Sequence, residues 1–301
     1  MTHITITGAS GFVGTSLISY LPSDGYHINS LSLRGNNKIE IHQGTNSVIH
    51  LAGKAHDTKK ALNPDVYYGG NYELSKYLFD AFINSSAQKF IFISSVKASA
   101  DQVSDILKEI DIPNPQTHYG KSKLMAEEYI QNQSLPAGKT YYILRPCMIH
   151  GPSNKGNLNL LFNIAKKGIP WPLGAYENKR SFCSIDNICF VIQELIENEN
   201  IPSGVYNIAD DDPLSTNELI RLIAESQGKK CHIWHFPKNI ITLLAKLGDF
   251  IKLPLNTERL NKLKEYYVVS NSKIKQAINK SLPVLSKVGL LKTFKSFNNN
   301  I

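Results

Sequence analysis

A strand that passes through closely spaced glycines into a helix stands at the start of the chain, and few folds accommodate that order. The segment HITITGASGFVGTSLISYL, residues 3–21, begins with β-branched residues and continues with apolar residues at helical spacing. Gly8, Gly11 and Gly14 separate the two parts. The first glycine permits a tight turn, the second lets a pyrophosphate approach the backbone, and the third lets the helix pack closely on the strand. A purely structural turn is the alternative, but this position favours a dinucleotide site at the helix N-terminus.

Short apolar runs alternate with helical patterns through the first half of the chain. The runs are residues 47–53, 89–95 and 140–146, and the helical patterns are residues 63–85 and 120–133. This alternation predicts an α/β fold of the Rossmann type, with a doubly wound parallel sheet and right-handed crossovers. Ligands of such sheets bind beyond the carboxyl ends of the strands, so we expect the site there.

Composition narrows the class of protein. The chain has 301 residues, of which 42% are hydrophobic and 19% charged, as in soluble globular proteins. The N-terminus shows no signal-peptide pattern and the four cysteines show no CxxC pairing, so we expect a reduced, cytoplasmic protein. The most apolar run, residues 240–253, is interrupted by charged residues well short of the ~20 residues that span a membrane. It predicts an amphipathic surface helix and no membrane insertion.

The formal net charge of +8 is spread along the chain without dense basic runs. This distribution gives little support to a nucleic-acid partner and suits an anionic small-molecule substrate. The acidic residues of ADDDP, residues 209–213, point in different directions and are not accompanied by a histidine or cysteine cluster. We therefore expect a turn there, and no metal site.

Three polar residues are placed to meet at the expected ligand edge. Ser95 ends a buried strand, and Tyr119 and Lys123 lie four positions apart on one helix face. A tyrosine with a pKa near ~10 is a poor base unless positive charge stabilises its phenolate, and Lys123 with an oxidised nicotinamide ring would supply that charge. Ser95 would bind the oxygen on the reacting carbon while Tyr119 exchanges its proton. Taken singly, the three could equally be a strand-end cap, a half-buried helix residue and a solvated lysine.

Six segments spread over most of the chain match the motifs of one known family. They are TGASGFVG (7–14), HLAG (50–53), FIFISSVKA (90–98), YGKSK (119–123), LRPCMIHGP (144–152) and NKRSFCSIDN (178–187). In these segments the chain resembles the extended short-chain dehydrogenase/reductases of the NAD-dependent epimerase/dehydratase family, within its UDP-glucose 4-epimerase-like nucleotide-sugar subgroup. The resemblance implies that Ser95, Tyr119 and Lys123 are catalytic and that a UDP-sugar is the substrate.

The same resemblance implies two domains. Residues 1–152 would form the NAD(P)-binding Rossmann domain, with later segments near 181–208 returning to it. Residues 153–301 would mainly form a smaller α/β substrate-binding domain. Relatives often dimerise through helices that include the YGKSK segment, so a homodimer is expected.

The glycine motif and the resemblance together give a set of cofactor-binding candidates. These are Gly8, Ser10, Gly11, Phe12, Val13, Gly14, Ser32, Arg34, Leu51, Ala52, Gly53, Asn71, Ser94, Tyr119, Lys123 and Pro146. NAD enzymes usually carry an acidic residue at the end of the second strand, where this chain has Ser32 followed closely by Arg34. A guanidinium without a neighbouring carboxylate suits a 2′-phosphate, so the sequence favours NADP and leaves NAD open.

The resemblance also gives candidates for binding the substrate. These are Ser95, Lys97, Asn157, Leu158, Arg180 and Arg259. Asn157 and Leu158 match the family's uridine-side pair. Arg180 and Arg259 could bind the diphosphate or the uridine, because a guanidinium makes paired contacts with phosphate. The alternative for an isolated arginine is a surface salt bridge.

Two departures from the family pattern bear on the reaction. Only 17 residues, 33–49, separate Ser32 from His50, where the family fits another helix and strand. The adenine end should therefore be abbreviated and open, which argues against permanent cofactor retention. Met148 stands where galactose epimerases commonly have asparagine, which favours another UDP-hexose, N-acetylated or 4-keto.

The resemblance implies a 4-epimerase that acts at C4 of a UDP-hexose or UDP-N-acetylhexosamine. The catalytic residues alone leave open a reductase of UDP-4-keto-6-deoxy-hexosamines for surface polysaccharide synthesis. A dinucleotide-sensing protein without catalytic activity is the more distant alternative.

Overall fold

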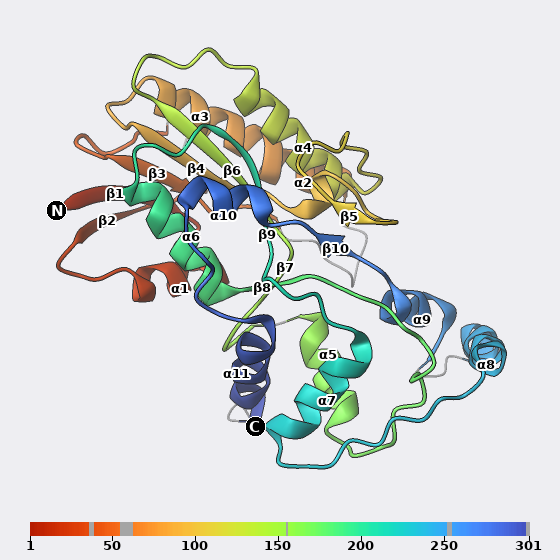
Figure 1. Ribbon diagram of the computed structural model, residues 1–301. Helices are drawn as coiled ribbons and strands as arrows, with labels where there is room; N and C mark the ends of the chain where they lie inside the picture. Colours follow the sequence, from red (N-terminus) through yellow and green to blue (C-terminus); the bar gives the residue numbers. More distant parts are fainter. Residues whose placement is uncertain (36–38, 55–62, 155, 252–254, 299–301) are drawn as a thin grey trace.

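A six-stranded parallel sheet forms the centre of the computed structural model, which describes residues 1–35, 39–54, 63–154, 156–251 and 255–298 (Figure 1). In spatial order the strands are β2 (Tyr26–Leu31), β1 (Thr2–Thr7), β3 (Ser47–His50), β4 (Lys89–Ile93), β6 (Thr140–Pro146) and β9 (Gly204–Ile208). All pairings are parallel, and Ile4 lies beside Ile28. The central strands are buried on both faces, which is why the sequence shows them as continuous apolar runs.

Helices cover both faces of this sheet (Figure 1). They are α1 (Phe12–Tyr20) and α6 (Ile185–Glu197) on one face, and α3 (Leu74–Ile83) and α4 (His118–Gln131) on the other. Leu17 of α1 and Ile188 of α6 share a buried cluster with Ile4. Ala126 of α4 is in the cluster of the opposite face with Phe90. The predicted α/β, doubly wound Rossmann fold is confirmed.

The crossover from β3 to β4 differs from the single helix predicted for residues 63–85. It consists of α2 (Pro64–Tyr67), a π-helical turn (Tyr68–Glu73) and α3. Gly69 and Gly70 lie in the turn and lower the local preference for a regular α-helix. Such wide turns are frequent at functional sites, and this one carries the fully buried side chain of Asn71.

The connection from β2 to β3 is short, as the sequence predicts. The described residues between them, 32–35 and 39–46, form no helix or strand. β2 pairs with β1 and is one of the two edge strands of the sheet.

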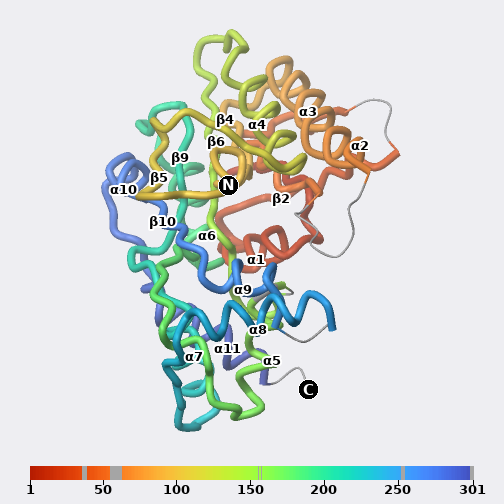
Figure 2. The backbone as a smooth tube through the Cα atoms, turned by 90° about the vertical axis from the view of Figure 1, so that its right-hand side faces the viewer, coloured from red at the N-terminus to blue at the C-terminus, as the bar shows by residue number. Residues whose placement is uncertain are grey.

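After β6 the chain alternates between the sheet and the lower part of the molecule (Figures 1 and 2). The returning elements are α6, β9 and α10 (Ser272–Ile278). The lower part contains α5 (Asn157–Ala165), α7 (Thr216–Ser226), α8 (Lys238–Ile251), α9 (Thr257–Lys264) and α11 (Ser286–Asn298). Phe162 of α5, Leu219 of α7 and Phe294 of α11 belong to its buried cluster.

Two small parallel sheets complete the fold. They are β7 (Met148–His150) with β8 (Phe182–Ser184), and β5 (Ile106–Leu107) with β10 (Val268–Val269). The amphipathic helix predicted for residues 240–253 is present as α8. No helix in the described ranges is long and apolar enough to cross a membrane.

Candidate functional site

The glycine turn between β1 and α1 has room for backbone only. Gly8 has a φ of +73°, and a Cβ atom there would lie 2.7 Å from the amide nitrogen of Ala52. A Cβ atom on Gly14 would lie 2.4 Å from the carbonyl oxygen of Gly8, so helix and strand pack in close contact. Gly11 caps α1 without a side-chain hydrogen bond, which leaves amide groups of the first turn for an external acceptor. This geometry fits the diphosphate of a dinucleotide.

The other predicted cofactor-binding residues lie near the carboxyl ends of neighbouring strands. Ser10 is exposed in the glycine turn, Phe12 and Val13 are half-buried in the first turn of α1, Leu51, Ala52 and Gly53 follow β3, and Pro146 ends β6. A Cβ atom on Gly53 would lie 2.8 Å from Oδ1 of Asn71 and 3.2 Å from Nζ of Lys123. Gly53 therefore gives the backbone close access to the catalytic helix.

Ser32 and Arg34 lie just beyond β2. Both side chains are exposed, and the amide of Arg34 donates to Oγ of Ser32 at 3.3 Å. They stand at the edge of the sheet, where the described residues of the connection to β3 form no helix or strand.

Asn71 connects the segment after β3 to α4. Its Oδ1 accepts from the amide of Lys54 at 2.8 Å, and its Nδ2 donates to Oγ of Ser122 at 3.0 Å. The Nδ2 group also donates to the carbonyl of Lys54 at 3.2 Å. The Asn71 side chain therefore makes these three hydrogen bonds to two residues, and the structure gives it a positioning role beside Gly53.

The three predicted catalytic residues come together. Ser95 follows β4, is nearly buried, and accepts a hydrogen bond from the amide of Lys97 at 3.2 Å. The hydroxyl of Ser95 lies close enough to the phenol of Tyr119 to act on its pKa as a polar neighbour. Lys123, on the next turn of α4, donates to the carbonyl oxygen of Ile93 at 2.9 Å. The arrangement puts a hydroxyl, a phenol and an ammonium group at the carboxyl ends of the central strands.

The electrostatics of these residues differ in part from the expectation. Burial raises the pKa of Tyr119, and the neighbouring hydroxyl of Ser95 lowers it by less. Burial lowers the pKa of Lys123 to about 8, with Glu127 acting in the opposite direction. Lys123 is not among the groups that shift the pKa of Tyr119; its ammonium donates to the backbone and lies 4.7 Å from the ring centroid of Phe92.

A buried ion pair behind the catalytic residues was missed by the sequence analysis. Glu127 is one turn after Lys123, and its carboxylate accepts from Nε of Arg145 at 3.0 Å and from Nη2 at 2.5 Å. Ser94 was predicted to bind cofactor, but its Oγ donates to the same carboxylate. Ser94 therefore fixes β4 against α4. The interval of four residues between Lys123 and Glu127 was the sequence signal that could have placed Glu127 on the same helix face.

Two of the predicted substrate residues meet around a carboxylate that was not predicted. The side chains of Lys97 and Arg180 lie 3.7 Å and 3.4 Å from the carboxylate oxygens of Glu265. The ammonium of Lys97 also lies 4.2 Å from the ring centroid of Tyr267. Arg180 donates to the carbonyl oxygen of Lys262, at the end of α9, at 3.4 Å. This group, Lys97, Arg180, Glu265 and Tyr267, is called the basic cluster below.

The remaining substrate candidates are more dispersed. Leu158 is buried in the apolar cluster of the lower part, which gives it a packing role. Asn157 begins α5, but its side chain lies outside the described residues. Arg259 is exposed on α9, the helix whose last turn contacts Arg180.

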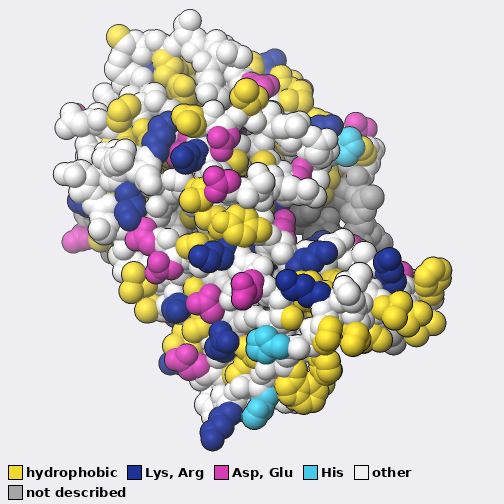
Figure 3. All heavy atoms as spheres, turned by 45° about the vertical axis from the view of Figure 1, so that its right-hand side comes forward, with side chains coloured by type: hydrophobic (Ala, Val, Ile, Leu, Met, Phe, Trp, Pro, Cys, Tyr) yellow, Lys and Arg dark blue, Asp and Glu magenta, His cyan; other side chains and the backbone are white. Residues whose placement is uncertain are grey.

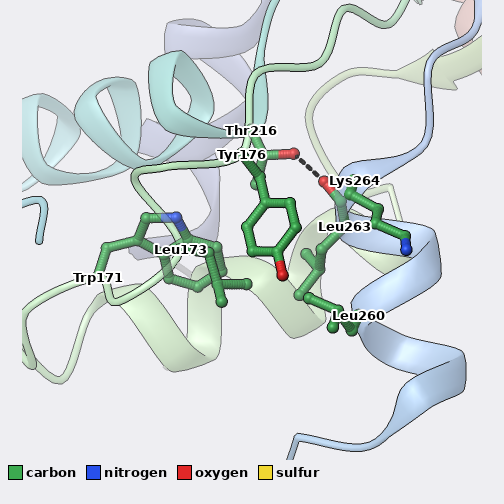
Figure 4. A pocket seen from close by; sticks show the side chains of 7 residues that line it. All are labelled: Trp171, Leu173, Tyr176, Thr216, Leu260, Leu263 and Lys264. Atoms are coloured by element: carbon green, nitrogen blue, oxygen red, sulfur yellow. Dashed lines mark hydrogen bonds between the residues drawn. The ribbon is translucent and has the colours of Figure 1, made fainter. Parts of the chain in front are cut away.

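Two hollows lie in the lower part. In the apolar hollow, Tyr176 lies between the leucines of α9 and the segment that carries Trp171 (Figure 4). Its lining residues are Trp171, Leu173, Tyr176, Thr216, Leu260, Leu263 and Lys264. Oγ1 of Thr216 donates to the carbonyl of Leu263 at 2.7 Å, which fixes α9 to α7. The other, of about 480 Å³, is lined by Gly174, Glu177, Asn178, Lys179, Ser215, Asn217, Glu218, Arg221, His235 and Tyr266. Neither contains a predicted site residue.

The acidic turn at 209–213 serves the fold. The carboxylate of Asp210 accepts from the amide of Ser184 and from Nδ2 of Asn187 at 2.9 Å and 2.7 Å, and lies 3.2 Å from Nε2 of His150. Within the described parts of the chain no cluster of side chains is suited to hold a metal, and all four cysteines are free.

Comparisons with known proteins agree with this geometry. A family model described as "NAD dependent epimerase/dehydratase family" matches residues 4–209. A UDP-glucose 4-epimerase of Vibrio cholerae is 30% identical over 261 residues, which cover 78% of either chain. An N-acetyl-alpha-D-glucosaminyl-diphospho-ditrans,octacis-undecaprenol 4-epimerase of Escherichia coli O157:H7 is 30% identical over 260 residues, 78% of this chain and 75% of that one.

The fold also has solved counterparts. The crystal structure of a UDP-N-acetylglucosamine 4-epimerase from Bacillus cereus superposes with a TM-score of 0.76 at 20% identity, over 99% of this chain and 100% of that one. At this identity the likeness concerns the fold.

Proposed function

Because this chain belongs to the NAD-dependent epimerase/dehydratase family, we propose that it inverts the configuration at C4 of a UDP-hexose or UDP-N-acetylhexosamine. The observation that carries the proposal is the proximity of the Ser95 hydroxyl to the phenol of Tyr119, with Lys123 on the next helical turn. Hydroxyl, phenol and ammonium are the groups needed to move a proton at a sugar hydroxyl. The names of the compared relatives favour an epimerase over the reductase alternative.

The glycine turn would hold the dinucleotide. Amide groups at the start of α1, beside Gly8 and Gly11, suit its diphosphate, and Gly53 leaves space beside Lys123. When bound, the nicotinamide would supply reversible hydride transfer at C4. Exposed Arg34 beside Ser32 supports NADP as well as NAD.

The protein's own residues would then move and hold the C4 proton. Ser95 would donate a hydrogen bond to the C4 oxygen, and Tyr119 would take the hydroxyl proton and return it after the sugar has turned over. Lys123 would stabilise negative charge on the phenol and bind the ribose next to it. The fixed spacing of Tyr119 and Lys123 on α4 would keep the proton path the same for both faces of the sugar.

The substrate's diphosphate would lie at the basic cluster. Lys97 and Arg180 would supply cationic donors there, and both lie within ion-pair distance of Glu265. We assign cofactor binding mainly to residues 1–152 with segments near 181–208, and substrate binding mainly to 153–301. A cytoplasmic location, supported by the free cysteines, and a homodimer through α3 and α4 are parts of the same proposal.

The first experiment follows the sugar and the cofactor together. Purified protein is incubated with NAD or NADP and with UDP-glucose, UDP-galactose or their N-acetyl counterparts, with products separated by chromatography and absorbance read at 340 nm. We expect interconversion of C4 epimers without net cofactor consumption. Steady oxidation of NADPH by a UDP-4-keto-6-deoxy-hexosamine would instead identify a reductase. Cofactor binding with no turnover of any sugar would support a dinucleotide-sensing protein.

A further inference from the structure

Helix α8 exposes a continuous apolar face. Its members have exposed fractions of 45–85% and are Ile240, Leu243, Leu244, Leu247, Phe250 and Ile251. Spacings of three and four residues put them on one side of the helix. The residues that α8 buries, Ile241, Ala245 and Gly248, form a separate stripe toward the body of the protein. Apolar patches of this kind on a soluble domain mark interaction surfaces.

The surroundings of this face have the composition of a membrane-surface helix. Trp234 and Phe236 precede α8, are 51% and 40% exposed, and pack edge to face with ring centroids 5.8 Å apart. Exposed Lys238 and Lys246 lie on α8 itself. Figure 3 shows hydrophobic side chains gathered on the projecting lower right edge, with lysine and arginine side chains beside them. Aromatic and aliphatic residues next to lysines favour the interface of an anionic bilayer.

Hydrogen bonds hold α8 to the protein at both ends. The hydroxyl of Tyr176 donates to the carbonyl of Lys238 at 3.1 Å. The carboxylate of Asp249 accepts from the amide and Oγ1 of Thr257, the first residue of α9, at 3.0 Å and 2.6 Å. The apolar face is therefore presented by a helix fixed at its two ends.

The basic helix next to α8 connects this face to the candidate substrate site. α9 carries Arg259, Lys262 and Lys264, and the carbonyl of Lys262 accepts from Arg180. Glu265 follows α9 and contacts both cations of the basic cluster. A bilayer at α8 would thus lie close to the part of the protein that is suited to bind diphosphate.

We propose that α8 docks the protein on the surface of an anionic lipid bilayer, with its apolar face among the headgroups and acyl chains and with α9 beside the lipid phosphates. The net charge of +8 complements such a surface. The inference goes beyond the proposed function and does not depend on it, because membrane binding can be measured without turnover. In this proposal lipid, and not a second copy of the chain, covers the apolar face of α8.

Vesicle flotation tests the proposal directly. The full-length protein is mixed with vesicles of equal parts phosphatidylcholine and phosphatidylglycerol, or of phosphatidylcholine alone. We expect binding to the anionic vesicles that weakens at high salt, and a fall of about tenfold or more in the variant Leu247→Glu/Phe250→Glu. The matched control is Ile110→Glu/Ile112→Glu, which changes two residues that are 86% and 90% exposed on another segment and should bind as the wild type does.

Two results would overturn the proposal. One is wild-type protein that fails to float with anionic vesicles, or floats equally well after the α8 substitutions. The other is a dimer in solution that the α8 substitutions dissociate, which would make this face an interface between copies of the chain. Thermal melting and epimerase turnover in detergent-free buffer, both expected to be unchanged, verify that the variants are folded.

Discussion

Tyr119 is subject to two opposing effects on its pKa. Burial raises it, because a phenolate loses hydration in an apolar environment, and the neighbouring hydroxyl of Ser95 lowers it. Burial prevails. A neutral phenol donates a proton readily but accepts one only after it has lost its own, so the base role requires more positive charge near the ring. We propose that Lys123, one helical turn away, supplies it once cofactor and substrate are bound.

Removing the phenol hydroxyl should abolish most turnover. In Tyr119→Phe we expect kcat to fall about 10²- to 10⁴-fold, because the ring still packs but no longer exchanges the proton. Chromatography of the sugar epimers measures the loss. Tyr67→Phe is the control, since its ring centroid lies 6.2 Å from that of Tyr119, and its turnover should stay near wild type. Undiminished turnover in Tyr119→Phe would exclude Tyr119 as the acid and base.

The pKa of Lys123 predicts a basic limit to activity. Burial lowers this pKa to about 8, so the charged form is present below that pH and is lost as the pH rises through it. We expect kcat to decline with a midpoint near pH 8 in a profile taken from neutral to strongly basic pH. Lys123→Arg should keep its charge and lose this decline, even if its overall rate is lower. A wild-type profile that stays level well above pH 8 would contradict the role of the ammonium.

Helix α4 carries two of the three residues that we propose to be catalytic. Tyr119, Lys123 and Glu127 follow one another at intervals of four residues and therefore share a face. Thr117 caps the helix by accepting from the amide of Gly120 at 3.2 Å, which fixes its start. Near its other end, Glu127 ties the helix to the ends of β4 and β6 through its serine and arginine partners. The position of the phenol is thus set from both ends of the helix.

Neutralising the buried carboxylate should affect stability and catalysis together. In Glu127→Gln we expect the free energy of unfolding to fall by about 3–5 kcal/mol, because Arg145 keeps its charge in a buried site without its partner. Glu127 also raises the pKa of Lys123, so the basic decline in kcat should move to lower pH. Denaturant unfolding and pH profiles measure the two effects. Exposed Glu128→Gln is the control; a profile that does not move in Glu127→Gln would limit Glu127 to a structural role.

The fold brings residues that are distant in sequence to one edge of the sheet. Features with a local sequence signal could therefore be predicted, and contacts made only in the folded chain could not. The strands, the glycine turn and the shared helix face of Tyr119 and Lys123 were readable because their signals are local: apolar runs, glycine spacing and an interval of four residues. The partner of Ser94, the contact of Lys97 with Glu265 and the π-helical turn were not readable. Their causes lie in tertiary packing, which no short window of sequence contains.

The short connection after β2 should make the cofactor exchangeable. With no helix or strand among the described residues between β2 and β3, the adenine end has fewer enclosing elements, and Arg34 is exposed there. We expect gel filtration to strip the dinucleotide and added NAD or NADP to restore turnover. Arg34→Ser should weaken the response to NADP more than that to NAD. Stoichiometric cofactor in the filtered protein, measured by chromatography after denaturation, would contradict this expectation.

If the short connection after β2 lets the dinucleotide exchange, the activity of the protein depends on the dinucleotide pool of the cell. An epimerase that keeps its dinucleotide for life works independently of metabolism around it. One that exchanges it must draw the oxidised form from the common pool before each series of turnovers. Its rate would then follow the balance between oxidised and reduced dinucleotide, so that a shift toward fermentation or oxygen shortage would slow sugar interconversion with no change in the amount of enzyme or sugar.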